Sequence, residues 1–487
     1  MRLTRDMEAV PGVRRAAAMM GTPANRALLE DAGLLAAEGE AAGPTDLVIA
    51  VLADTREAAE VARAAAESAF SARRAAAMPG VAGRPLTLAS ALKALPGATL
   101  ALISVPGAYA GAEALKALHA GLHVMLFSDN VPVATELELK TLARQRGLFV
   151  MGPDCGTAIV NGVPLGFANA VARGRIGIAA ASGTGLQEVA CHLAAAGEGI
   201  SQAIGVGGRD LSDEVGGLMM ERALAALAAD PETAAVCVIG KPPGAATLAK
   251  LEGWIAKLGK PCVTQLMAPT GRERWHAAAT LEDAALAAVA LARGVKPAPV
   301  EFTAPPGAVA RLVEDAVLPM RANQRYVRGV YSGGTLAYEA LGILKTRLAD
   351  VAPGVTGGGS GHRVVDLGED VFTVGRPHPM LDGTVRREWI ERESADPETA
   401  VLLLDVVLGY GAHPDPAGEI LPAIRAATLA AESAGRHLAV VASVTGTEGD
   451  PQRRSAQVAA LSAGGVIVMP SNAQAARLAA LIAEPRA

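Results

Sequence analysis

Two short segments of the chain combine an apolar run with a turn of serine, threonine and glycine. The residues of these turns are Ser182, Gly183, Thr184 and Gly185 in the first segment, and Ser332, Gly333, Gly334 and Thr335 in the second. A strand that turns into a helix leaves backbone amides unpaired at the helix start, and the positive end of the helix dipole adds to their attraction for anions. The turns therefore predict two anion sites, for phosphate or for phosphate and a carboxylate. Plain helix capping is the alternative.

Four basic residues follow expected strands or lie between prolines, where their side chains can contact a bound anion. They are Arg209, Lys241, Arg376 and His378. Arg209 either grips an anion or pairs with Asp210. The two prolines after Lys241 give its amine a fixed direction. Arg376 is a candidate carboxylate clamp, because its fork matches two oxygens, and His378 is a candidate acid, base or hydrogen-bond donor. A loop stiffened for packing is the alternative for the last two.

Size and composition exclude several classes of protein. The 487 residues suggest about three domains. With 51% hydrophobic and 19% charged residues, a net charge of -5 and no basic stripe, nucleic acid is not an expected partner. Four cysteines without a CxxC pair argue against a metal site and favour a reducing cytoplasm. No apolar stretch reaches about 18 residues, so no membrane partner is expected.

Short apolar runs alternate with helical patterns along the whole chain, which predicts an α/β fold with parallel sheets. The expected strands are 46–53, 99–106, 123–127 and 148–152, then 175–180, 202–206, 234–239 and 261–264, and finally 328–331, 362–366, 400–405, 438–442 and 466–469. The last two sets share a Ser-Gly turn and the phrase Asp-Pro-Glu-Thr-Ala, at 230–234 and 396–400. Duplication of one domain explains this agreement better than coincidence.

Several longer phrases resemble a known family. Residues 103–107, 151–155 and 178–185 follow the order found in the α subunit of succinyl-CoA synthetase, and the FdrA proteins, which carry a second ligase-type domain, are more similar still. The resemblance implies a Rossmann-like CoA-binding-type domain followed by two flavodoxin-like domains. The expected boundaries are 1–160 for the degenerate Rossmann-like domain, 170–296 for the first ligase-type domain, 297–322 for a Pro-rich linker, and 323–487 for the second.

Two activities follow from this resemblance. Some FdrA proteins form the large subunit of an oxamate carbamoyltransferase of allantoin breakdown, which moves a carbamoyl group between oxamate and phosphate together with two further subunits. In that reading phosphate or carbamoyl phosphate is a substrate, no cofactor is tightly bound, and Lys241 contacts the carbamoyl oxygen. The alternative is a component of an acyl-CoA synthetase that uses CoA and ATP or ADP. A scaffold without catalytic activity is a third possibility.

Two departures from the synthetase pattern favour the transferase. The expected first strand is followed by residues 51–57 instead of a Gly-rich turn, so Asp54 and Glu57 would repel the phosphates of CoA. No ATP-grasp domain is recognisable. His276 aligns with the histidine that the synthetase phosphorylates, but Trp275 and three alanines replace its flexible glycine flanks. A partly exposed histidine before a helix is therefore expected instead.

Overall fold

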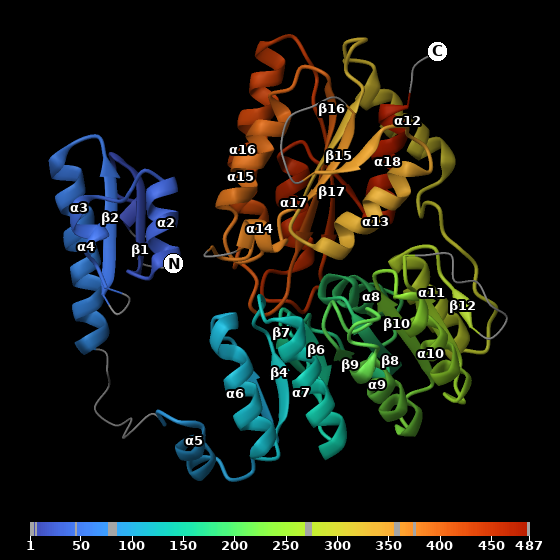
Figure 1. Cartoon of the computed structure of the whole chain (residues 1–487). Helices are drawn as coiled ribbons and strands as arrows, with labels where there is room; N and C mark the ends of the chain where they lie inside the picture. Colours follow the sequence, from blue (N-terminus) through green and yellow to red (C-terminus); the bar gives the residue numbers. More distant parts are fainter. Residues whose placement is uncertain are drawn as a thin grey trace. The chain divides into compact units, whose positions relative to one another are not determined.

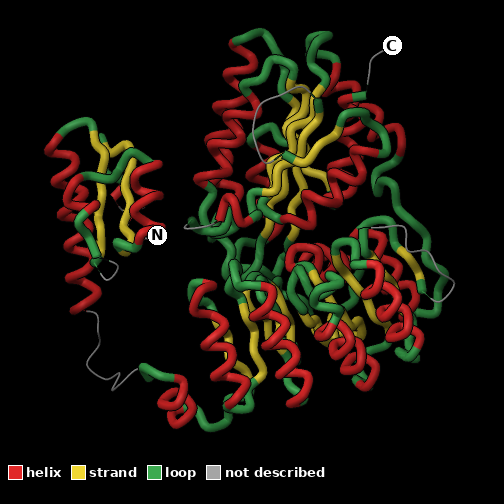
Figure 2. Tube along the Cα trace, in the orientation of Figure 1, coloured by secondary structure: helices red, strands yellow, loops and turns green. Residues whose placement is uncertain are grey.

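The computed structural model describes residues 4, 7–43, 46–75, 85–267, 275–354, 361–373 and 376–484. The chain divides into two compact units. The first unit comprises residues 1–97 with 374–377, and the second comprises 98–373 with 378–487. Figure 1 labels the elements and Figure 2 shows which segments are helix, strand or loop.

The first unit is built on two antiparallel strands. They are β1 (Val13–Met20) and β2 (Leu47–Ala53), accompanied by helices α2 (Pro23–Asp31), α3 (Ala37–Glu40), α4 (Arg56–Ala75) and α5 (Leu88–Ala94). The strand expected at 46–53 is present, but among the described residues it pairs with β1 alone. It therefore does not open a Rossmann-like domain that extends to residue 160, since a continuous apolar run does not reveal which strand will pair with it.

The second unit begins with a three-stranded parallel sheet. Its strands are β3 (Leu100–Ile103), β4 (His123–Leu126) and β5 (Val150–Met151), with helices α6 (Gly107–His119) and α7 (Val133–Arg146). The first turn of this sheet is the segment after Ile103 and not residues 51–57. The argument against CoA from Asp54 and Glu57 therefore fails, because those residues lie in the other unit.

The next sheet has seven strands. In order they are β12 (His276–Ala277), β11 (Cys262–Gln265), β10 (Ala235–Gly240), β8 (Arg173–Ala181), β9 (Ile200–Gly205), β6 (Thr157–Val160) and β7 (Val163–Gly166). The helices are α8 (Gly183–Ala195), α9 (Leu218–Ala229), α10 (Ala245–Ala256) and α11 (Leu281–Ala292). Counted from β8, the five parallel strands have the order 2-1-3-4-5 of flavodoxin-like sheets, and the β6–β7 hairpin extends one edge.

A six-stranded parallel sheet repeats this plan. In order its strands are β14 (Val351–Pro353), β15 (His362–Asp366), β13 (Tyr326–Tyr331), β16 (Thr399–Val407), β17 (Ala439–Thr445) and β18 (Ile467–Met469). The helices are α13 (Gly334–Lys345), α14 (Asp370–Thr373), α15 (Thr384–Ser394), α16 (Pro416–Ser433), α17 (Arg454–Ala463) and α18 (Asn472–Ala483). From β13 onward, and apart from β14, the order is again 2-1-3-4-5, as duplication requires.

The expected linker also contains structure. Helix α12 (Pro306–Val317) begins directly after a Pro-rich stretch, and its residues Val309 and Ala316 are buried in the core. That core is continuous through both large sheets, because helices α8, α11, α13 and α18 all contribute buried side chains to it. The two ligase-type sheets consequently share one hydrophobic core.

A buried ion pair joins the three-stranded sheet to the seven-stranded one. Lys140 of α7 is fully buried and donates to Glu136 at 2.7 Å, to Asp210 at 2.7 Å and to the carbonyl of Val206 at 2.9 Å. All three donors of the ammonium group are therefore used. Asp210 also accepts from the amides of Met219 and Met220, so it anchors the start of α9 at the same point.

We predict that Lys140→Ala lowers the free energy of unfolding by about 3–5 kcal/mol, because it leaves the buried carboxylate of Asp210 without a cation and Glu136 with Arg209 alone. Lys116→Ala is the matched control, since its pair with Glu113 on α6 is exposed and worth about 0–1 kcal/mol. Urea unfolding of both variants measures the difference. Equal losses in the two variants would contradict the structural role of Lys140.

Candidate functional site

The first Ser-Gly turn lies at the carboxyl end of β8, where α8 begins. Ser182 is the N-cap, and its hydroxyl accepts a hydrogen bond from the amide of Gly185 at 3.0 Å. No acceptor within the described residues pairs with the amides of Gly183 and Thr184. The hydroxyl group of Thr157 lies beside Gly183. It is buried, and it likewise has no hydrogen-bond partner among the described residues. The turn thus retains free donors at the positive end of α8.

The second turn meets the first directly. Ser182 Oγ lies 2.5 Å from Thr335 Oγ1, and a side chain on Gly333 would stand 3.0 Å from the methyl group of Thr184. The N-cap of α13 is Gly333, so Ser182 corresponds in structure to Gly333 and Thr184 to Thr335. The two helix starts therefore face each other, and their hydroxyl groups are in contact.

A carboxylate of the protein already holds the second turn. Asp405, fully buried in β16, accepts from the amide of Ser332 at 2.8 Å, from that of Gly333 at 2.8 Å and from the Ser332 hydroxyl at 3.0 Å. Arg386 pairs with the same carboxylate at 2.9 Å. These contacts fill the place that an external anion would take, so the prediction of an open anion site at Ser332 and Gly333 is corrected.

The first turn has no such carboxylate, for a reason that the strand register makes plain. Tyr331 lies two residues before the cap Gly333 and is level with Asp405, because Val330 pairs with Leu404. Ala180 lies two residues before the cap Ser182 and pairs with Ile239. Ile239 thus stands where the duplicate domain has Asp405. Of the two turns, the one at Ser182 is the open one.

A second carboxylate, Asp366, lies at the end of β15 beside the start of α13. A side chain on Gly334 would collide with its Oδ2, and its Oδ1 accepts from the amide of Gly368 at 2.9 Å. Burial raises the pKa of Asp366 to about 6, against the opposing effects of the Gly368 hydrogen bond and the Lys241 charge. Asp366 is absent from the residues predicted to form the site, although its place after a strand was a usable signal.

His378 approaches the same point. A side chain on Gly368 would stand 3.0 Å from His378 Nε2, and the amide of Met380 donates to Nδ1 at 3.2 Å. Burial lowers the pKa of His378 to about 4, although Asp129 acts in the opposite direction. At neutral pH the ring is therefore uncharged, with its proton assigned to Nε2 by the Met380 contact, so it is a hydrogen-bond donor toward Gly368.

Lys241 and Asp154 complete the cluster at the carboxyl ends of the strands. Lys241 follows β10, is exposed, and lowers the pKa of both Asp154 and Asp366 by its charge. Solvent reaches the side chain of Asp154, yet the protein around it desolvates the carboxyl group, and with Asp129 this raises its pKa to about 7. Asp154 lies near Gly208 of the turn after β9. Its phrase was noted in the sequence, but its carboxylate was missed.

The contacts of Arg209 differ from both predicted ones, which were a bound anion and Asp210. Its Nε donates to Glu136 at 3.0 Å and its terminal nitrogen to the carbonyl of Val131 at 2.7 Å, whereas Asp210 is the partner of Lys140. The guanidinium group thus fastens the turn after β9 to the start of α7. Because two of its donor groups are used in this way, the prediction that Arg209 is a free anion clamp is corrected.

Two predicted residues lie apart from this cluster. Arg376 is exposed and is grouped with the first unit, so the second unit does not bring it to the turns. His276 is half-buried in β12, where it pairs with Val263 of β11, and residues 268–274 before it lie outside the described residues. Strand β12 is three strands from β8, about 14 Å at the usual spacing. His276 is thus partly exposed and precedes α11, as expected, but it lies in an edge strand of the sheet.

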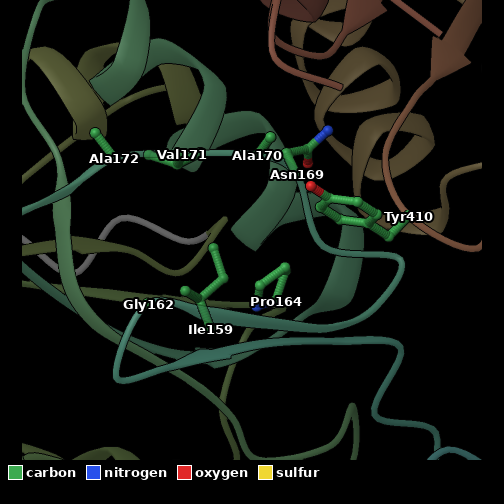
Figure 3. A pocket seen from close by; sticks show the side chains of 8 residues that line it. All are labelled: Ile159, Gly162, Pro164, Asn169, Ala170, Val171, Ala172 and Tyr410. Carbon is green, nitrogen blue, oxygen red and sulfur yellow. The ribbon is translucent and has the colours of Figure 1, made fainter. Parts of the chain in front are cut away.

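A segment from the first ligase-type sheet ties the site to the second. The side chain of Asn169 donates to Asp450 at 2.8 Å and to the carbonyl of Leu408 at 3.1 Å, and the amide of Tyr410 donates to the Ala168 carbonyl at 2.9 Å. Beside this junction is a cavity of about 320 Å³, in which Figure 3 shows Tyr410 next to Asn169. The hydrogen bonds of the junction hold the two domains in register. Most residues of the cavity wall are apolar, so we assign no chemistry to the cavity.

Comparison with known proteins identifies relatives for both parts of the chain. The CoA-ligase family model matches residues 330–482, and the model of the AllF heavy metal-associated domain matches 1–84. The uncharacterized Escherichia coli protein YahF is 38% identical over 98% of this chain and 95% of its own length. The α subunit of succinate–CoA ligase from Aquifex aeolicus is 31% identical over 38% of this chain and 62% of its own.

Among solved structures, PH0766 from Pyrococcus horikoshii is 16% identical, with a TM-score of 0.31 over 81% of this chain and 86% of its own. This likeness is too weak to carry an argument about the site. Among the described residues, no helix is both long and apolar enough to cross a membrane.

The residues of the first unit do not suit a heavy metal, in spite of the domain family that matches them. Residues 1–97 contain neither cysteine nor histidine, and soft metals such as copper and zinc bind to those side chains. The described residues of the chain also hold no group of three or more metal-binding side chains. We therefore assign no metal chemistry to this unit.

The raised pKa of Asp366 makes a prediction about stability. Its folded pKa of about 6 exceeds the ordinary value of 3.8, so the folded state holds the proton more tightly between these values. The proton-linked stability is present in full below the unfolded pKa of 3.8, falls as the pH rises toward the folded pKa of about 6, and is lost above it. Asp366→Asn, which keeps an acceptor for Gly368, should gain about 2–3 kcal/mol over the wild type between pH 4 and pH 8. Urea unfolding at both pH values checks this, and a constant difference would refute it.

Proposed function

The chain belongs to the CoA-ligase family that includes YahF and resembles the α subunit of succinate–CoA ligase, and from this premise we propose that it is a carbamoyltransferase subunit of the FdrA type. The proposed reaction joins the carbamoyl group of carbamoyl phosphate to the nitrogen of oxamate, giving oxalurate and phosphate, or runs in reverse. The AllF-type model over residues 1–84 supports a role in allantoin breakdown.

The observation that carries this proposal is the open turn at Ser182. The free amides of Gly183 and Thr184, the Thr157 hydroxyl, and whichever of the Ser182 and Thr335 hydroxyls does not donate to the other are donors around one helix start. Such a set suits the phosphoryl group of a small donor. Because Asp405 fills the other turn, we propose one phosphate site in each chain, with Thr335 as the contribution of the second domain.

The remaining groups of the cluster suit carbamoyl transfer. Lys241 is a cation close to the turn, where negative charge develops on the carbamoyl oxygen. Neutral His378 can donate a hydrogen bond from Nε2. Formation of the new C–N bond releases a proton from the oxamate nitrogen, and Asp154 or Asp366, with pKa values of about 7 and 6, can accept it. Arg376 stays a proposed clamp for the oxamate carboxylate, to be brought in on assembly with two further subunits.

The test uses the chain assembled with its partner subunits. Phosphate release from carbamoyl phosphate should require oxamate. Ser182→Ala should raise the KM for carbamoyl phosphate about tenfold, and Lys241→Met should lower kcat about a hundredfold. Thr22→Ala, which removes an N-cap in the first unit, is the matched control and should leave both constants unchanged. Release without oxamate, or an unaffected Ser182→Ala enzyme, would refute the proposal.

The matching CoA-ligase model favours one other activity, that of an acyl-CoA synthetase component. This reaction passes phosphate through a histidine, and His276 is the aligned residue. Its position in β12 requires that strand to leave the sheet before the imidazole can reach the turn at Ser182. Acid-labile phosphate on His276 after incubation with ATP and the partner subunits would select this activity, and its absence together with oxamate-dependent turnover would exclude it.

A further inference from the structure

Each of the two facing helices carries a buried glutamate that caps a helix of the opposite domain. Glu188 and Glu339 lie four residues after Thr184 and Thr335, which are equivalent positions in α8 and α13. Glu188 accepts from the amide of Asn472, the first residue of α18, at 3.1 Å. Glu339 accepts from the amide of Leu281, the first residue of α11, at 2.7 Å. The two capping contacts are therefore related by the duplication.

The two glutamates differ in what neutralises them. His192, four residues beyond Glu188 on the same face of α8, lies 3.1 Å from its carboxylate. The equivalent position in α13 is Ile343, and no basic side chain of the described residues forms an ion pair with Glu339. Burial alone would raise the pKa of Glu188, but His192 and neighbouring hydrogen bonds lower it overall. Burial raises the pKa of Glu339 to about 7.

Glu339 also faces a large cavity, which we call the Glu339 cavity. Its volume is about 650 Å³, and its wall is formed by Gln265, Met267, Ala277, Ala278, Ala279, Thr280, Glu301, Tyr338, Glu339, Gly342, Ile343, Thr346, Arg347 and Arg477. Ile343, which is the counterpart of His192 in the duplicate helix, forms part of this wall. The cavity therefore lies beside the position at which the duplicate helix has a histidine.

A second buried acceptor lines the same cavity. Gln265, at the end of β11, is 3% exposed, and its Oε1 has no hydrogen-bond partner. Its amide nitrogen is directed to the Ala279 carbonyl at 3.4 Å. A buried acceptor without a donor is costly, typically by about 1–3 kcal/mol. Glu339 differs from Gln265 in this respect, because Oε1 accepts from the Leu281 amide and Oε2 accepts from the Asn472 side chain at 2.8 Å. Its carboxyl group thus has hydrogen-bond donors but no cation among the described residues, whereas Gln265 Oε1 has no donor there.

The other walls limit what can bind there. Met267, Ala278 and Ile343 provide apolar contact. At the rim, Arg347 pairs with Glu301 at 3.1 Å and with Glu484 at 3.0 Å, so its charge is balanced. Arg477 donates to the Val300 and Glu301 carbonyls. An anion would face the Glu339 carboxyl group and the unpaired Gln265 oxygen, whereas a cationic donor with a flat apolar face would pair with the first and satisfy the second.

We propose that the Glu339 cavity binds a small organic cation with a planar N–H donor group, a guanidinium or an amidinium, which donates to Glu339 and Gln265. Such a fork matches a carboxylate and has N–H groups left for an amide oxygen. The ligand would thus supply Glu339 with the basic partner that His192 supplies to Glu188. The site is independent of the proposed transferase reaction, because it contains none of the residues of the Ser182 turn.

The test follows the binding of methylguanidinium to the full chain by isothermal titration calorimetry. The wild type should bind one equivalent per chain. Ile343→His restores the histidine of the duplicate helix at the equivalent position, so it should weaken binding by about tenfold or more. Ile343→Leu is the matched control, which keeps an apolar side chain of the same size and should bind like the wild type.

Gln265→Met provides a second, independent variant, because it keeps the length of the side chain and removes the acceptor, together with the long amide contact to the Ala279 carbonyl. It should also weaken binding, while thermal unfolding confirms that the variant is folded. Two results would overturn the proposal: the absence of saturable binding to the wild type, or equal affinity in the wild type, Ile343→His and Gln265→Met. Guanidinium binding that is lost in both variants but kept in Ile343→Leu supports it.

Discussion

The meeting of two helix starts is the constraint on which the rest of the second unit depends. Helices α8 and α13 carry partial positive charge at their first turns, and these turns touch through Ser182 and Thr335 at 2.5 Å. Such a contact is unfavourable unless negative charge is placed beside it. The protein supplies that charge to α13 with Asp405 at the cap and Asp366 next to Gly334. At α8 the equivalent place belongs to Ile239, so this helix start has no such carboxylate, which is why we propose it as the phosphate site.

Duplication followed by loss of symmetry explains more than this one pair. The reciprocal caps of Glu188 and Glu339 bind each ligase-type domain to the last helix of the other. In that pair Glu188 of α8 has a basic partner, His192, whereas Glu339 of α13 has none among the described residues. The Ser-Gly turn and the buried glutamate thus each occur twice. In one copy the protein supplies the group of opposite charge, and in the other copy it does not. Functional groups in a duplicated fold are to be sought where the copies differ.

The sequence predicted the helices and strands better than it predicted which of them pair or pack together. Strand runs and Ser-Gly turns are local, so the parallel sheets and the two helix starts could be predicted. The strand at 47–53 was placed in the wrong sheet, since an apolar run has the same appearance in a two-stranded sheet as in a large one. Asp405 lies 73 residues from Ser332, and Arg209 lies 73 residues from Glu136. Only the register of the strands and the packing of the helices bring such residues together.

The charge balance of the open turn links its structure to the chemistry that suits it. A phosphate that enters beside Ser182 adds negative charge near Asp154 and Asp366, whose pKa values already stand at about 7 and 6. That charge raises the proton affinity of both carboxyl groups, so in the proposed reaction an ionised one becomes a stronger acceptor for the proton that the oxamate nitrogen loses. When the phosphoryl group leaves, the carboxyl groups become acidic again and release that proton. The proposed phosphate site and the proposed proton acceptor are in this way coupled by charge.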